Sequence, residues 1–430
     1  MRFQQDMPVP LPFMKKEISE KLILLAGILG FLVILLLTFF HQQPPLFDEA
    51  YFVKNFELFR TYGLSKEFLL RMDNQAPGPL YELVHFAFKP LTGLTTPGIR
   101  LVNVFLLGMT ILLLARIITL IKKDVSGSSL SWSIALIAVP MVWQVTGLAL
   151  TEMPTMFFSV LSVLLLLLAI KTEAFVLKSC LLALLAGVTL GLSILGRSPF
   201  LTLGLASASL LLYHLNDGKR WRTLIIYGVC ALAIAVPVFI IWDGLVPPQQ
   251  AFVGRGFSFW HGILAYAYGA LLTVFIAPRW FYFNKRIILY MVVCYVLLLM
   301  MNMMLVRYEY APLDRTLAKV LPQAFMKIYP LMISPLLATL SLYFIFSSAW
   351  QGWLNRKRPV FIFLLLAGML ILASSFKVTH LFSTRYVAQA APFFVMIFPG
   401  YDRPTLGRLL RFIIAMAIGY FSLETYFHLM

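Results

Sequence analysis

The sequence predicts an all-α protein: a polytopic bundle of about 13 transmembrane helices. The 430-residue chain is 60% hydrophobic and 12% charged, whereas soluble domains are about 45–50% apolar and about 25% charged. Apolar runs of roughly 17–25 residues recur along most of its length, which is typical of membrane-spanning helices. The strands of a membrane barrel would alternate apolar and polar residues instead, so a barrel is excluded.

The basic residues orient these spans. Lys and Arg gather in cytoplasmic loops, and the N-terminal segment 1–20 carries Arg2, Lys15 and Lys16. An N-terminus inside the cell also puts every later dense basic cluster inside. The expected spans are 21–40, 100–121, 130–147, 153–170, 179–196, 199–213, 223–241, 260–277, 287–305, 329–349, 359–375, 386–399 and 410–427.

The loop 41–98 then lies outside. Within it, 48–63 and 78–93 show helical apolar spacing with polar faces, and both are short for spans. We therefore expect helices lying in the membrane interface. If 78–93 were a short span, the orientation of everything after it would invert, and the basic clusters argue against that.

Composition also limits the other function classes. The net charge of +17 fits cytoplasmic loops better than nucleic-acid binding. The three cysteines lie in apolar runs, so no disulfide framework is expected. The six histidines form no HxxxH or HExxH motif, and neither a P-loop nor a GxGxxG after a strand occurs. No metal or cofactor is predicted. The first apolar run lacks a small-residue cleavage site and is expected to remain as a span.

Ionisable residues gather at the outer ends of the expected spans. Each one alone is explained as a solvated helix end, but so many on one rim predict a site facing the extracytoplasmic side. They are Asp48, Glu49, Glu152, Arg197, Asp243, His261, Glu309, Asp314, His380 and Arg385.

The carboxylates at the rim have two readings. Asp48 and Glu49 follow the first span directly, and Glu152 precedes the span at 153–170. One of the paired acids could remove a proton from an acceptor hydroxyl while its neighbour positions a sugar hydroxyl. Alternatively, both only supply negative charge to the first turn of a helix, and Thr151 or Glu152 is only an N-cap.

The cations at the rim have no acid close by in sequence. Arg197 lies in a tight turn, and a guanidinium there is suited to gripping a phosphate through two hydrogen bonds. Arg255, His261, His380 and Arg385 could hold the same phosphate or diphosphate headgroup. The alternative for each is an ordinary anchor in the lipid headgroup region.

The order of these motifs resembles the GT-C superfamily of integral-membrane glycosyltransferases. The similarity spans roughly 46–390 and is strongest in the first 200 residues. Within the superfamily, the chain is most similar to the branch that uses dolichol-phosphate-glucose for α-1,2-glucosyl transfer. The chain would be a bacterial relative of that branch. The matching residues are Asp48-Glu49, Pro77 to Tyr81, Arg100 to Asn103, Thr151-Glu152, Arg197 and Arg385-Tyr386. The chain departs around Asp48-Glu49 and lacks Gln-Thr-Asn after Arg197, so sugar and acceptor stay open.

The resemblance implies roles for these positions. Asp48 is the expected catalytic base, and Glu49, Glu152 and Tyr81 are expected to contact acceptor or sugar. The resemblance also implies a polyprenyl-phosphate sugar donor, a glycan or lipid-linked acceptor, and inverting direct displacement on the extracytoplasmic face. The expected modules are 21–240, catalytic, and 241–430, completing the donor-lipid site. A bacterial inner membrane is favoured over the endoplasmic reticulum.

Two other functions remain open. A polyprenyl-linked glycan ligase or polymerase would use a diphosphate donor and typically a basic outer loop, whereas the loop 41–98 is rich in acids. A lipid or solute transporter tends to show repeated halves and charges near the membrane midplane. The chain shows no internal repeat, and its ionisable groups gather at one face.

Overall fold

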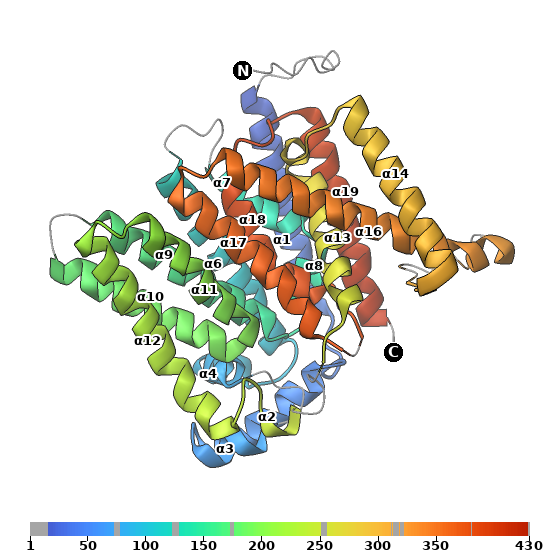
Figure 1. Cartoon of the computed structure of the whole chain (residues 1–430). Helices are drawn as coiled ribbons and strands as arrows, with labels where there is room; N and C mark the ends of the chain where they lie inside the picture. The colour runs from blue at the N-terminus through green and yellow to red at the C-terminus, as the bar shows by residue number, and fades with distance from the viewer. Residues whose placement is uncertain are drawn as a thin grey trace.

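The computed structural model is an all-α bundle (Figure 1). It describes residues 16–72, 78–122, 129–172, 176–250, 256–310, 312, 318, 322–379 and 381–428, and no strand occurs among them. Within these ranges, 10 helices are long and apolar enough to cross a membrane. They are α1 (Lys16–Phe40), α6 (Gly98–Ile121), α9 (Glu152–Lys171), α10 (Val176–Gly196), α12 (Gly218–Trp242), α13 (Phe259–Ile276), α14 (Lys285–Met301), α16 (Gln323–Leu354), α17 (Pro359–Ala373) and α19 (Leu406–His428).

Three of the 13 expected spans take other forms. The segment predicted at 130–147 is a broken pair, Ser129–Ala138 and Pro140–Gly147 (α8), bent by 78°. The break falls at Val139, which is extended. The residue before a proline is disfavoured in the helical conformation, and Val139 precedes Pro140. Helices α11 (Leu201–Tyr213) and α18 (Arg385–Ile397) have 13 residues each, about 20 Å, which is short of a hydrocarbon core of about 30 Å. The number of spans by length and composition is therefore ten, or eleven with the bent pair.

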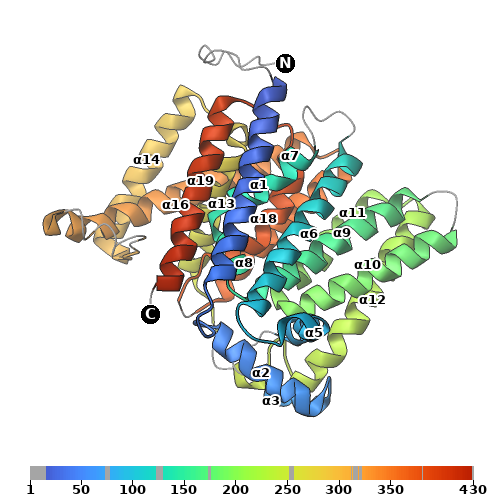
Figure 2. The same ribbon diagram turned by 180° about the vertical axis from the view of Figure 1, so that it is seen from behind.

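The loop between α1 and α6 folds into short helices, as the sequence predicts. They are α2 (Glu49–Tyr62), α3 (Lys66–Arg71), α4 (Leu80–Ala87) and α5 (Lys89–Thr92). Figures 1 and 2 show α2 and α3 at the end of the bundle opposite the N-terminus. The short helices therefore cover one end of the bundle, and the N-terminus lies at the other end.

One continuous apolar core holds the bundle together. It extends from Ile23 in α1 to Phe427 in α19. Helix α10 packs between α9 and α12, and α19 packs against α8 and α1. Helix α18 contacts α17, α13 and α8, and its residues 387–397 are all buried. Helix α18 is short and buried, and it begins at Arg385. Its first residue therefore lies at one end of the bundle.

Two glycines allow the outer helices to approach the spans. A Cβ on Gly78 would lie 1.9 Å from the carbonyl oxygen of Leu195, and one on Gly196 would lie 2.2 Å from Thr155 Oγ1. Only glycine avoids these overlaps, so the chain entering α4 can lie directly on the ends of α9 and α10. This contact brings α4 beside Arg197.

Candidate active site

Asp48 and Arg385 form the exposed ion pair of the candidate site. Arg385 Nη1 lies 2.7 Å from Asp48 Oδ2, and the two side chains are 21% and 29% exposed. Asp48 is the N-cap residue of α2, but its side chain makes no capping hydrogen bond. Arg385 Nε donates to Ser383 Oγ at 3.0 Å, which fixes the guanidinium at the start of α18. The Asp48 carboxylate therefore faces Arg385 instead of its own helix.

Glu49, the next residue, is completely enclosed. Arg100 Nε donates to Glu49 Oε1 at 2.9 Å and Arg100 Nη2 donates to Oε2 at 2.6 Å, and neither side chain is exposed. The backbone N–H groups of Leu46 and Ala149 donate to the same carboxylate at 2.7 and 2.6 Å. Glu49 thus ties three segments together: its own loop, α6 and the chain before α9.

Asn103 extends this arrangement by one helical turn. Its Nδ2 lies within hydrogen-bond distance of the carbonyl oxygens of Val145, Leu148 and Leu150, at 3.2, 3.1 and 2.9 Å. Residues three apart on a helix share a face. One side of α6 therefore holds both the segment with Glu49, through Arg100, and the segment 145–150, through Asn103. The segment they fix leads straight into Glu152.

Glu152 pairs with Arg197 across the site. Arg197 Nη2 donates to Glu152 Oε1; the glutamate is fully buried, while the arginine is 15% exposed. Thr151, the N-cap residue of α9, makes no side-chain capping bond. Arg197 Nε is buried and has no hydrogen-bond partner. Arg197 has no acid close by in sequence, but helix packing supplies one that is distant in sequence.

The two partly exposed pairs belong to one electrostatic cluster. Burial acts to lower the pKa of Arg385, but the Glu152 and Asp48 carboxylates outweigh it and raise that pKa above its ordinary value. Tyr386 lies within electrostatic reach of both acids and of Arg197 as well as Arg385. Two carboxylates, two guanidinium groups and a phenol therefore converge where α2, α9 and α18 begin and α10 ends.

Behind this cluster lies a buried polar group carried by α4. Tyr81 stacks on Phe56 with the ring centroids 5.6 Å apart. Burial, together with the charges of Glu49 and Glu82, raises the pKa of Tyr81. Burial also raises the pKa of Glu82 to about 8 and lowers the pKa of His85 to about 3. Burial therefore favours the neutral form of all three groups.

The remaining predicted residues lie on one side of the cluster or outside the described chain. His261 lies in the first turn of α13 (Phe259–Ile276), and its Nδ1 lies 2.6 Å from the carbonyl oxygen of Val378. The His261 ring is 5.8 Å from that of Phe382, which in turn neighbours Tyr386. Arg255 and His380 fall outside the described residues.

Two solved structures of ArnT from Cupriavidus metallidurans are similar to this chain. The apo structure has a TM-score of 0.43 and the structure bound to undecaprenyl phosphate has a TM-score of 0.39, both at 14% identity. They match 93% and 92% of this chain and 77% of theirs. No protein-family description and no curated relative matches the chain.

Sequence reasoning assigned no role to Arg100, Asn103, Glu82 or His85. The signal for the first two was present as a polar pair at i and i+3 in an otherwise apolar span. Glu82 and His85 show the same spacing on α4. In a short helix of a loop, this spacing predicts a polar face exposed to solvent. In the structure both Glu82 and His85 are buried instead.

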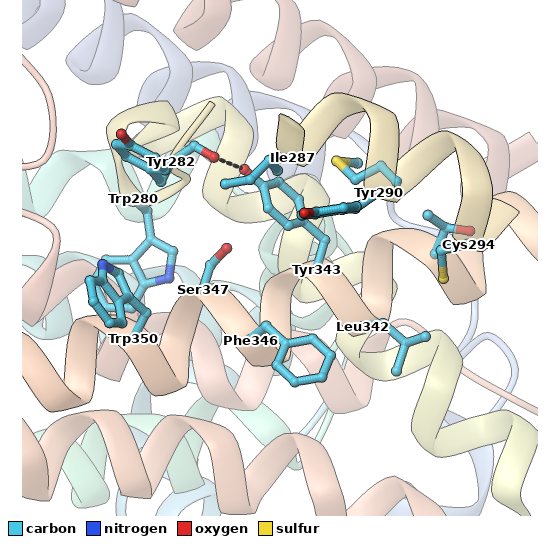
Figure 3. Close-up of a pocket in the computed structure, with 12 residues that line it drawn as sticks. Trp280, Tyr282, Ile287, Tyr290, Cys294, Leu342, Tyr343, Phe346, Ser347 and Trp350 are labelled. Carbon is cyan, nitrogen blue, oxygen red and sulfur yellow. Dashed lines mark hydrogen bonds between the residues drawn. The ribbon is translucent and has the colours of Figure 1, made fainter. Parts of the chain in front are cut away.

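An aromatic pocket lies elsewhere in the bundle. It has a volume of about 380 Å³ and is lined by α14, α16 and the turn before α14 (Figure 3). Tyr343 Oη donates to the carbonyl oxygen of Tyr282 at 2.5 Å across it. Its lining includes Trp280, Tyr290 and Trp350 but no member of the ion pairs. This pocket is therefore separate from the candidate active site.

Proposed function

We propose that the protein is a multi-pass membrane glycosyltransferase of the GT-C type. It transfers a sugar from a polyprenyl-phosphate donor to a hydroxyl group of a glycan or lipid-linked acceptor, on the extracytoplasmic face. The observation that supports this most strongly is the partly exposed Asp48–Arg385 pair beside Glu152–Arg197. In these two pairs a carboxylate that a substrate could reach lies beside guanidinium groups suited to binding a phosphate. Both pairs lie at one end of the apolar bundle.

The proposed reaction is a single inverting displacement. Asp48 takes the proton of the acceptor hydroxyl as that oxygen forms a bond to the anomeric carbon. The bond from this carbon to the phosphate oxygen breaks, and its electron pair leaves with the polyprenyl phosphate. Arg385 and Arg197 meet the growing negative charge on the phosphate. The acceptor oxygen and the leaving phosphate oxygen lie on opposite sides of the anomeric carbon, so in this proposal the Asp48–Arg385 contact of 2.7 Å opens when donor and acceptor bind.

The other residues have supporting roles in this proposal. Glu49 is sealed against Arg100, so it positions the loop that carries Asp48 instead of contacting acceptor itself. Glu152 orients Arg197 and, through it, the phosphate or a sugar hydroxyl. Tyr81 supports α2 from behind. We retain His261, Arg255 and His380 as further donor-phosphate ligands.

The wider setting also belongs to the proposal. Residues 21–240 form the catalytic module and 241–430 complete the donor-lipid site. A bacterial inner membrane remains the favoured location. The dolichol-phosphate-glucose-type branch and hexose transfer follow from the motif order alone.

A donor panel tests the function. Purified protein in lipid nanodiscs is incubated with polyprenyl-phosphate sugars and, in parallel, polyprenyl-diphosphate sugars, and donor consumption is measured by mass spectrometry. We expect consumption of a monophosphate donor that is lost in Asp48→Asn. Consumption of diphosphate donors alone would favour the ligase or polymerase. Movement of an intact lipid or solute across the bilayer without donor cleavage would favour the transporter.

A further inference from the structure

Two histidines and a glutamate meet where α1 and α19 end beside the first outer loop. His41 follows α1 directly, and Glu424 and His428 lie in the last turns of α19. One ligand atom from each lies within 4.8 Å of the other two, the one such group in the described part of the chain. The two helices contact each other, and the stacking of His41 on Phe427 holds together the ends that carry these residues.

Hydrogen bonds already orient the donor atoms of this group. His41 Nδ1 lies 2.8 Å from the carbonyl oxygen of Leu37; that oxygen can only accept, so Nδ1 carries the proton and Nε2 is left as a lone pair. Metal-binding histidines are commonly held by such a backbone contact. His41 Nε2 and His428 Nε2 lie 4.0 and 2.8 Å from Glu424 Oε1. Glu424 Oε2 is buried without a hydrogen-bond partner.

We propose that His41, Glu424 and His428 bind one divalent transition metal, with zinc as the ion that this donor set favours. Two imidazoles and one carboxylate form a known zinc ligand set, with a water in the fourth position. Ligand bonds of about 2.0–2.2 Å require only small movements from the present separations. The His428 side chain is 69% exposed, so it is free to make them.

A salt bridge between Glu424 and His428 would account for only part of this arrangement. These residues lie four apart on α19 and can pair within any helix. His41 comes from a different helix, and its ring stacks on Phe427 with centroids 4.2 Å apart. The nearby cation Arg100 is paired with Glu49, lies 5.4 Å from the Phe427 ring centroid, and donates from Nη1 to the backbone carbonyl oxygen of His41 at 2.9 Å. The third ligand is what distinguishes a metal site from a helix pair.

The metal would fasten the segment that leads to Asp48. Gln43 Nε2 donates to the carbonyl oxygen of Phe427 at 3.2 Å, and Phe47 packs on Tyr426 with ring centroids 5.2 Å apart. Residues 41–47 therefore already lie along the end of α19. A metal at His41 adds a bond between these same two segments, so the ion acts as a structural clamp and takes no part in sugar chemistry.

Metal binding is tested with the ion alone. Protein without a polyhistidine tag is treated with chelator, incubated with Zn²⁺ or Co²⁺ and desalted, and the retained metal is measured by mass spectrometry. We expect about one zinc ion per chain, tetrahedral cobalt absorption, and a higher Tm with zinc, because a ligand that binds only the folded state stabilises it. His41→Ala and His428→Ala should each lose the retained metal and the Tm shift.

His214→Ala is the matched control, because it removes a histidine at the far end of α11 and should bind metal like the wild type. Glu424→Gln keeps the size of the side chain and tests whether the carboxylate is a ligand. Wild-type protein that retains no zinc, or His41→Ala that retains as much as wild type, overturns the proposal. The readout needs no sugar donor, so its failure is separate from failure of the proposed glycosyltransferase activity.

Discussion

Asp48 and Glu49 are neighbours in sequence with opposite surroundings. Glu49 is sealed in the protein with four N–H donors from three segments, while Asp48 is 29% exposed and faces one guanidinium that is itself 21% exposed. Both are paired with arginine, so pairing alone does not distinguish their roles. Their exposure does, because only Asp48 is accessible from outside the protein.

This difference separates positioning from chemistry. Consecutive residues of a helix point about 100° apart, so one carboxylate can face inward toward α6 while the next faces the site. The inward pair can hold the loop in place only because nothing reaches it. The outward pair is partly exposed, so in the proposed reaction a substrate can reach it and replace one partner. Substitutions at the two positions should therefore fail in different ways.

The largest expected effect is on turnover in Asp48→Asn. The amide keeps the size of the side chain but cannot accept the acceptor's proton, and loss of a general base typically lowers the rate about 10²–10⁴-fold. Turnover is measured with the donor identified in the panel, alongside donor binding and Tm, which should stay near wild type. Near-normal turnover in this variant, with Glu152→Gln inactive instead, would move the base to Glu152.

The second effect is on stability in Glu49→Gln. Removing one member of a buried ion pair leaves the other charge buried and costs about 3–5 kcal/mol, so a clear fall in Tm and in folded yield is expected. The double variant Glu49→Gln with Arg100→Met should recover part of the loss, since it leaves no charge behind. Full stability with lost turnover would show that Glu49 acts in the chemistry itself.

The third effect is on donor affinity in Arg385→Lys. Lysine keeps the charge but cannot reproduce a two-point guanidinium contact with phosphate, and we expect an increase of about tenfold in the KM for donor, equivalent to about 1.4 kcal/mol. Arg60→Lys is the control, because Arg60 is 64% exposed on α2 and pairs only with its neighbour Glu57. Equal KM values for Arg385→Lys and the control would contradict the assignment.

The smallest expected effect is a pH dependence of stability carried by Glu82. The ordinary pKa of the glutamate is 4.5, and burial raises it to about 8. Between these values the folded state holds a proton that the unfolded state has released, so stability should fall as pH rises through this window. His85, with its pKa lowered from 6.5 to about 3, gives the opposite slope below pH 6.5.

The range from pH 6.5 to 8 separates Glu82 from His85, and the comparison with Glu82→Gln removes the contribution of Lys122, whose pKa burial lowers to about 8. Tm measured across it should decline in the wild type and decline less in Glu82→Gln, which carries no titrating carboxyl at that position. Identical profiles for both proteins would mean that the carboxyl reaches water.

The sequence predicted the helical class, the short helices between α1 and α6 and the gathering of the key charges at one end of the bundle. Apolar run length and helical spacing are local properties, so they can be read directly. The partners of Arg197 and Arg385 were not predictable, because Glu152 and Asp48 reach them only through packing of distant helices. The same holds for α11 and α18, whose apolar segments read as spans although their helices have 13 residues each.

The contact between Asp48 and Arg385 also has a kinetic consequence for the proposed reaction. While the Arg385 guanidinium contacts Asp48, the carboxylate is engaged and is not free to contact an acceptor hydroxyl. An arriving donor phosphate competes for that guanidinium and frees the Asp48 carboxylate for the acceptor. The enzyme would then bind donor first and acceptor second. An acceptor bound alone would meet a base that is still occupied.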